Sequence, residues 1–130
     1  MESILLIEDN PDILENLTEY MQIEGYHILA TSNGKMGIEL AREFVPDLII
    51  CDSFMYGMNG HEVLRLLLAT PITAKIPFIF STSMSDSTDR LYALALGADD
   101  YIVKPFELET LLNMTRTCIN TGSKRQKTII

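Results

Sequence analysis

The chain has 130 residues, a length that fits one domain with a single hydrophobic core. Hydrophobic residues make up 47% and charged residues 22% of it, a globular composition that excludes a disordered chain. The formal net charge of −8 argues against direct nucleic-acid binding, because contacts to phosphates need Lys and Arg.

Five short apolar runs, each typical of a buried strand, alternate with five segments whose apolar residues recur at helical spacing. After the first run, Asn10 and Pro11 favour a helix start and Gly25 favours its end. We expect strands at residues 4–7, 26–30, 48–51, 78–80 and 101–103. This alternation predicts a doubly wound (βα)5 α/β fold with a five-stranded parallel sheet of order 2-1-3-4-5.

Residues 1–120 are expected to form this domain, because the periodic pattern stops after Asn120. Residues 121–130 have the composition of a linker or tail. The tail either ends the protein or leads to an effector domain beyond it.

No apolar run approaches the ~20 residues that a transmembrane helix needs. The run at residues 4–7 follows Glu2 and is too short for a signal peptide. A cytoplasmic protein without a membrane partner is therefore expected. In a reducing compartment Cys51 and Cys118, which lack metal-ligand spacing, are expected to be free thiols.

Acidic residues follow the first and third predicted strands. The carboxyl ends of parallel strands share one edge of a sheet, and ligands bind there where the strand order reverses. Glu8 and Asp9 follow the first strand, and Asp52 follows the third. Carboxylates that meet in one crevice repel one another unless a cation neutralises them, and Mg²⁺ prefers oxygen ligands. The sequence therefore predicts a magnesium site.

A hydroxyl and an ammonium group are expected at the same edge, from Thr82 after the fourth strand and Lys104 after the fifth. An aspartate can accept a phosphoryl group as a nucleophile. Hydroxyl and ammonium donors then stabilise the transferring oxygens. Taken singly, each residue is a strand end, a cap or a solvated lysine, but together they favour phosphoryl transfer to Asp52.

Over roughly residues 3–119 the sequence resembles the receiver domain of two-component response regulators, the CheY-like family. The resemblance implies a flavodoxin-like fold and a phosphorylation-driven switch that catalyses only its own phosphorylation and dephosphorylation. It also implies two kinds of partner, a sensor histidine kinase or phosphotransfer protein upstream and an effector downstream. The motifs that carry it are residues 7–10 (Ile-Glu-Asp-Asn), 47–52 with 57–60, 81–83, and 97–106.

By this resemblance, Asp52 is the phosphoacceptor and Mg²⁺ is the cofactor. Asp9 is expected to bind the ion directly, Glu8 to act through water, and Phe54 to supply a backbone carbonyl. Lys104 is expected to pair with Asp52 and then with the phosphoryl group, and its bond to Pro105 to be cis.

The resemblance further implies that Thr82 turns inward to hold a phosphoryl oxygen and that Tyr101 follows it as a rotameric switch. The surface of the fourth helix, fifth strand and fifth helix would then rearrange. The same face would serve a homodimer.

Three residues around the acceptor carry further expectations. Tyr56 stands where the family usually has proline, which removes a constraint on the loop and places a bulky aromatic group where a partner would approach. Phe54 and Met84 are apolar and should flank the path of an attacking water. Neither can orient that water, so slow self-dephosphorylation is expected.

Two other classes of function stay open. A pseudo-receiver would keep the fold as a binding module without phosphotransfer. An aspartate-nucleophile phosphatase or a flavodoxin-like FMN protein would be an enzyme or a redox carrier. Phe54 stands where such phosphatases carry a second aspartate, and the acidic loop at Glu8 would repel the FMN phosphate. His27 and His61 lie outside the site residues and are expected to be structural or surface residues.

Overall fold

The computed structural model describes residues 1–83 and 87–122, in which five strands alternate with five helices. All neighbouring strands are parallel, in the order β2-β1-β3-β4-β5, so the predicted doubly wound fold is confirmed. The elements are β1 (Ser3–Ile7), α1 (Pro11–Ile23), β2 (His27–Thr31), α2 (Gly34–Phe44), β3 (Leu48–Asp52), α3 (Gly60–Leu68), β4 (Phe78–Thr82), α4 (Ser87–Leu96), β5 (Asp100–Val103) and α5 (Leu108–Thr121).

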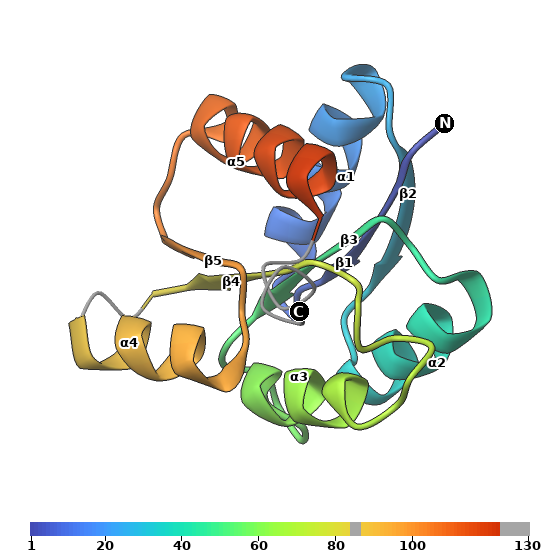
Figure 1. The fold of residues 1–130 in the computed structure, drawn as a ribbon. Helices are drawn as coiled ribbons and strands as arrows, with labels where there is room; N and C mark the ends of the chain where they lie inside the picture. The colour runs from blue at the N-terminus through green and yellow to red at the C-terminus, as the bar shows by residue number, and fades with distance from the viewer. Residues whose placement is uncertain (84–86, 123–130) are drawn as a thin grey trace.

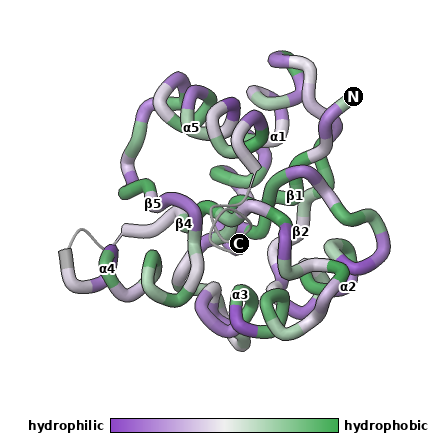
Figure 2. Tube along the Cα trace, viewed as in Figure 1, coloured by the Kyte–Doolittle hydropathy of each residue, from purple (hydrophilic) through white to green (hydrophobic). Residues whose placement is uncertain are grey.

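The sheet lies between two layers of helices, with α1 and α5 on one face and α2, α3 and α4 on the other (Figure 1). Successive strand residues point to opposite faces, so each strand contributes to two cores. Leu5 and Ile49 belong to the core under α2, α3 and α4. Ile4 and Ile50 belong to the core under α1 and α5. The central strands β3 and β4 therefore begin with apolar residues on both faces and become polar only at their carboxyl ends; Figure 2 colours each residue by its hydropathy.

Asparagine caps place the starts of three helices at the carboxyl edge of the sheet. The side chain of Asn10 accepts hydrogen bonds from the backbone N–H groups of Asp12 and Ile13, at 3.0 and 3.2 Å. Asn33 caps α2 and Asn59 caps α3 in the same way. Each cap satisfies N–H groups that lack a partner in the first helical turn. The loops that carry Glu8, Asp9 and Asp52 into these helices are thereby held in place.

The structure corrects some predicted boundaries. The strand β4 continues to Thr82 and β3 includes Asp52, so both residues end their strands instead of following them. The backbone N–H of Lys104 donates to the carbonyl of Thr82 at 2.6 Å, which extends the ladder past the apolar run. Helix α5 reaches Thr121, one residue into the predicted linker. Residues 123–130 lie outside the described part, so the tail remains a prediction.

Several other expectations from the sequence are met. Gly25 and Gly97, with φ of +100° and +126°, follow the ends of α1 and α4 as expected of helix stops. The Lys104–Pro105 peptide bond is cis. Cys51 and Cys118 are both buried and form no disulfide. Among the described residues, no helix has the length and apolar character required to cross a membrane.

Candidate functional site

Three carboxylates converge where β1 and β3 end side by side. Ile7 of β1 pairs with Cys51 of β3, so the residues that follow, Glu8 and Asp52, are neighbours across the sheet. One carboxylate oxygen each from Glu8, Asp9 and Asp52 lies within 4.8 Å of the others. Two oxygen ligands on opposite sides of Mg²⁺ lie about 4 Å apart, so this donor set fits a hard divalent cation.

The three carboxylates differ in exposure. Glu8 is 3% exposed and Asp52 is 7% exposed, whereas Asp9 faces solvent. The backbone N–H of Asn10 donates to Oε2 of Glu8 at 3.1 Å, which orients that carboxylate from the capping loop. The cluster therefore combines two buried carboxylates, set by the strands, with one on the open side through which an ion would enter.

Lys104 supplies the positive charge. It follows β5, and its Nζ lies 2.6 Å from Oε1 of Glu8 and 3.5 Å from Oδ2 of Asp52. Its side chain is 18% exposed, so both contacts are largely shielded from water. One ammonium thus faces two buried carboxylates, which leaves an excess of negative charge for a cation to neutralise.

Burial raises the pKa of Asp52 from 3.8 to about 7, with the negative charge of Glu8 as the next largest cause. The Lys104 ammonium and the backbone N–H of Phe54, 3.4 Å from Oδ1, act in the opposite direction. Without a cation the Asp52 carboxyl therefore binds a proton up to neutral pH. A divalent cation would compete with that proton for the same oxygen atoms.

Helix α3 begins in direct contact with the end of β3. The N–H of Gly60 donates to the carbonyl of Ser53 at 2.9 Å. A Cβ at position 60 would collide with the backbone carbonyl oxygen of Asp52. Only glycine permits this approach, which explains why α3 begins with a glycine.

The predicted switch residues lie on the side of the sheet covered by α3 and α4. Thr82 is completely buried and Tyr101 is 5% exposed. Both line a small cavity of about 30 Å³. Its other lining residues are Ser53, Phe54, His61 and Asp89.

Sequence reasoning missed His61 and Asp89 as members of this cavity. The sequence predicts a structural or surface position for His61 and gives no prediction for Asp89. In the sequence, His61 is marked only by its place after Gly60, and the close approach of Gly60 to Asp52 is visible in the structure alone. No local pattern marks Asp89, because α4 is far from α3 in sequence.

Two aromatic side chains stand at the rim of the site. Phe54 is 56% exposed and Tyr56 is 99% exposed. Gly57, next in the loop, has a φ of +88°. Met84, the second residue of the predicted water path, lies outside the described residues, so slow self-dephosphorylation stays a prediction.

Known proteins match this chain over most of its length. The family model of the response regulator receiver domain matches residues 4–116. Protein PilH of Pseudomonas aeruginosa is 37% identical over 112 residues, which cover 86% of this chain and 93% of PilH. The DNA-binding response regulator MtrA of Mycolicibacterium smegmatis is 34% identical over 115 residues, which cover 88% of this chain and 49% of MtrA.

A solved structure agrees in fold. The receiver domain of a signal transduction histidine kinase from Syntrophus aciditrophicus is 32% identical, with a TM-score of 0.85. The match covers 100% of this chain and 98% of that one. The chain thus spans nearly all of PilH but about half of MtrA.

Proposed function

The chain belongs to the response regulator receiver domain family, and from that premise we propose that Asp52 accepts a phosphoryl group in a magnesium-assisted reaction. Phosphorylation by a histidine kinase is standard for this family. The observation that carries the proposal is the cluster of Glu8, Asp9 and Asp52 oxygens within 4.8 Å, with the Lys104 ammonium beside it. A structural role alone would not require three carboxylates so close together.

Asp9, Asp52 and the Phe54 carbonyl would hold Mg²⁺, with Glu8 acting through water. Bound Mg²⁺ would neutralise negative charge on the carboxylates and on the phosphoryl oxygens. An oxygen of Asp52 attacks phosphorus as the bond to the donor imidazole breaks. The Lys104 ammonium and the Thr82 hydroxyl then donate hydrogen bonds to phosphoryl oxygens, and Tyr101 moves as Thr82 turns.

The chain's own catalysis would be limited to loading and unloading Asp52. Lys104 and Thr82, which bind the phosphoryl oxygens during phosphorylation of Asp52, would also bind them while water hydrolyses the aspartyl phosphate. Phe54 offers no hydrogen bond to that water, which favours a long-lived phosphorylated state.

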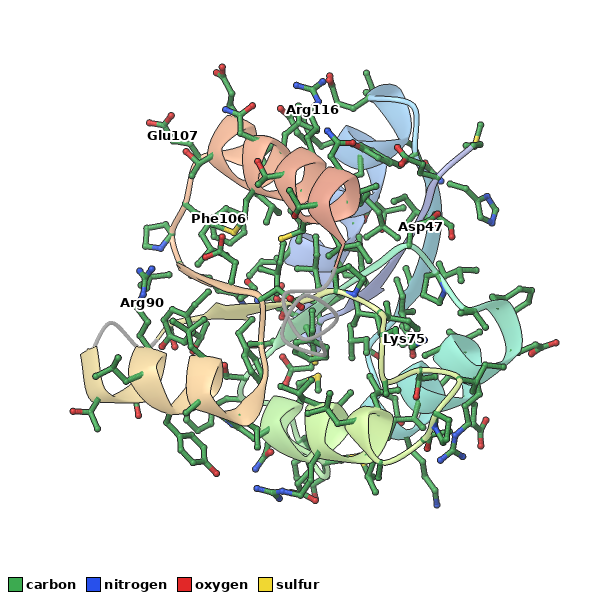
Figure 3. The ribbon with its side chains drawn as sticks, viewed as in Figure 1. Asp47, Lys75, Arg90, Phe106, Glu107 and Arg116 are labelled. Atoms are coloured by element: carbon green, nitrogen blue, oxygen red, sulfur yellow. The ribbon has the colours of Figure 1, made fainter. Side chains whose placement is uncertain are left out.

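A groove next to the acceptor suits the phosphodonor. Its volume is about 770 Å³, and it lies between α1 and the loop that joins β5 to α5. Ile13 and Tyr20 line it from α1, and Lys104 and Phe106 line it from the loop. Figure 3 shows Phe106 on the inner side of α5. Because Lys104 belongs to both groove and site, a helix of a histidine kinase or phosphotransfer protein seated here would bring its phosphohistidine to Asp52.

The downstream partner is proposed to bind the face made by α4, β5 and α5, which would also serve a homodimer. Leu91 and Tyr92 of α4 are 66% and 51% exposed and offer apolar area for such contact. The net charge of −8 supports a protein partner rather than nucleic acid. DNA binding is named for MtrA, and only about half of MtrA corresponds to this chain.

The direct test is incubation with acetyl phosphate and Mg²⁺, followed by intact-mass measurement. The wild-type chain should gain the mass of one phosphoryl group, and omission of Mg²⁺ or the change Asp52→Asn should abolish the gain. Asp47→Asn is the matched control, since Asp47 lies at the opposite end of β3, where it accepts from the Ser3 N–H (Figure 3).

The other two classes of function predict different results. No gain of mass under any condition would favour a pseudo-receiver. Repeated turnover of p-nitrophenyl phosphate would favour a phosphatase. A bound yellow flavin in the purified protein would favour a flavodoxin-like carrier.

A further inference from the structure

The side chain of His61 packs between the sheet and helix α4. It is the second residue of α3, and its ring centroid lies 4.8 Å from that of Phe80 on β4 and 5.3 Å from that of Tyr92 on α4. Both centroid distances fall in the range over which aromatic rings attract each other, and the interplanar angles are 32° and 43°. His61 therefore contacts both the strand that ends at Thr82 and the helix of the proposed output face.

The backbone next to His61 is in contact with the end of β3, the strand that carries Asp52. Gly60, its neighbour, donates to the Ser53 carbonyl at 2.9 Å and leaves no room for a Cβ beside the Asp52 carbonyl oxygen. Close-packed contacts of this kind transmit small displacements, because neither side can yield independently. A change in the backbone after Asp52 must therefore reach the first turn of α3.

The side chain of His61 also faces the predicted switch. With Thr82 and Tyr101 it lines the cavity of about 30 Å³. A cavity of this volume has room for a water molecule. A turn of the Thr82 hydroxyl toward Asp52, or a movement of the Tyr101 ring, would fill or enlarge that space directly beside the imidazole.

A second residue of α3, Arg65, also contacts Tyr92 of α4. The guanidinium of Arg65 donates to the hydroxyl of Tyr92 at 3.4 Å. Asp89, one helical turn before Tyr92, lines the cavity on the α4 side. Tyr92 is thus contacted from α3 by both His61 and Arg65, and Asp89 lies beside the cavity that His61 lines.

We propose that His61 is a positioning residue that couples the acceptor site to helix α4. Its neighbour Gly60 packs against the backbone of Asp52, so the backbone of His61 should move with the acceptor strand. Its ring contacts Tyr92 and lines the cavity that Thr82 and Tyr101 also line. Loading of Asp52 shifts the ring, and the ring shifts α4. This inference rests on the proposed function and adds a residue outside the phosphoryl-binding machinery through which the signal reaches the output face.

The experiment uses beryllofluoride with Mg²⁺ as the stable mimic of a phosphoryl group, and ¹H–¹⁵N spectra of the full chain as the readout. In the wild type, the mimic should shift the amide resonances of Ser87–Leu96 and the Cε1–H resonance of the His61 ring. In His61→Leu, the α4 shifts should fall to about half or less while the affinity for beryllofluoride stays close to the wild-type value.

Tyr92→Ala removes the contact from the α4 side and should reproduce the loss. This variant also decides the question if His61→Leu fails to fold, because Tyr92 is half exposed. Two matched controls should leave the α4 shifts intact. Leu91→Ala changes the exposed neighbour of Tyr92 on the same helix, and His27→Leu removes the other histidine, which is exposed on β2.

The outcomes separate the two proposals. A wild-type chain that does not bind beryllofluoride overturns the proposed function and this inference with it. Binding with full α4 shifts in both His61→Leu and Tyr92→Ala overturns the coupling role alone. A large loss of beryllofluoride affinity in His61→Leu would also overturn it, because His61 would then support the acceptor site itself.

Discussion

The ammonium nitrogen of Lys104 lies 2.6 Å from Oε1 of Glu8, closer than its 3.5 Å distance from Oδ2 of Asp52. The resemblance to receiver domains implied a pair between Lys104 and Asp52, and the structure adds a shorter contact with Glu8. Because the side chain of Glu8 is only 4% exposed, its charge has little access to water and depends on this ammonium. The two ion pairs share one lysine, so a change to Glu8, Asp52 or Lys104 alters the charge balance of the other two residues.

Removal of the lysine charge should destabilise the metal-free protein. In Lys104→Met, Glu8 and Asp52 face each other without compensation, so the free energy of unfolding at pH 8 should fall by about 3 kcal/mol. The loss should be smaller at pH 6, where Asp52 binds a proton and its charge disappears. Urea denaturation at both pH values measures this. Lys75→Met, at an exposed loop position (Figure 3), is the control and should change little.

Asp52→Asn should stabilise the metal-free protein at alkaline pH. The pKa of Asp52 rises from 3.8 to about 7 on folding, so between these values the native state binds more protons than the unfolded state. Stability contributed by this group is therefore lost as pH rises through that window. The full shift corresponds to about 4 kcal/mol, and water near the carboxylate reduces the expected gain to about 2 kcal/mol at pH 8.

The measurement for this variant is urea denaturation at pH 4, 6 and 8 with a chelator present. Wild type and Asp52→Asn should have similar stability at pH 4 and diverge toward pH 8. Asp47→Asn should run parallel to the wild type. Equal stability of Asp52→Asn and wild type at all three pH values would show that burial does not penalise the Asp52 charge.

Magnesium should stabilise the wild-type chain through the acidic cluster. At a free Mg²⁺ concentration 100-fold above the dissociation constant, the free energy of unfolding should rise by about 2.7 kcal/mol. Asp9→Asn removes the exposed carboxylate and should shift the required Mg²⁺ concentration upward by about tenfold or more. Thermal melting across a Mg²⁺ titration tests this. Asp12→Asn, an exposed neighbour outside the cluster, should behave as wild type.

Gly60→Ala should damage both the fold and the site. The added Cβ collides with the backbone carbonyl of Asp52, which cannot rotate away, so a loss of about 3 kcal/mol or more is expected. Gly37→Ala is the comparison: the atoms nearest to its added Cβ belong to the Ile7 side chain rather than to backbone, so this change should cost less. Thermal denaturation ranks the two variants. A Gly60→Ala protein as stable as Gly37→Ala would contradict the close approach of α3 to β3.

Phe54→Asn should shorten the life of the phosphorylated state. An amide at the half-exposed rim position can hold the attacking water, which phenylalanine cannot, so hydrolysis should accelerate by about tenfold or more. Decay of the phosphorylated mass after removal of acetyl phosphate measures it. Tyr56→Asn places the same amide at a fully exposed position in the same loop and should leave the rate unchanged.

Local sequence patterns were enough to predict the order of strands and helices and the edge at which the acidic residues meet. Apolar runs, the cap at Asn10 and the glycine stops act within a few residues of one another, so their structural effect can be predicted from the chain itself. Strict alternation then limits the topology, and the ends of β1 and β3 bring Glu8 and Asp52 together. The family motifs supplied the roles assigned to these residues.

Other features depended on how distant segments pack. Lys104 reaches Glu8 more closely than Asp52, and β4 extends to include Thr82 because the next strand continues the ladder there. His61 lies between Phe80 and Tyr92 only because α3 and α4 cover the same face of the sheet. Such contacts join residues far apart in sequence and depend on differences of about an ångström, for which no spacing of residue types provides a signal.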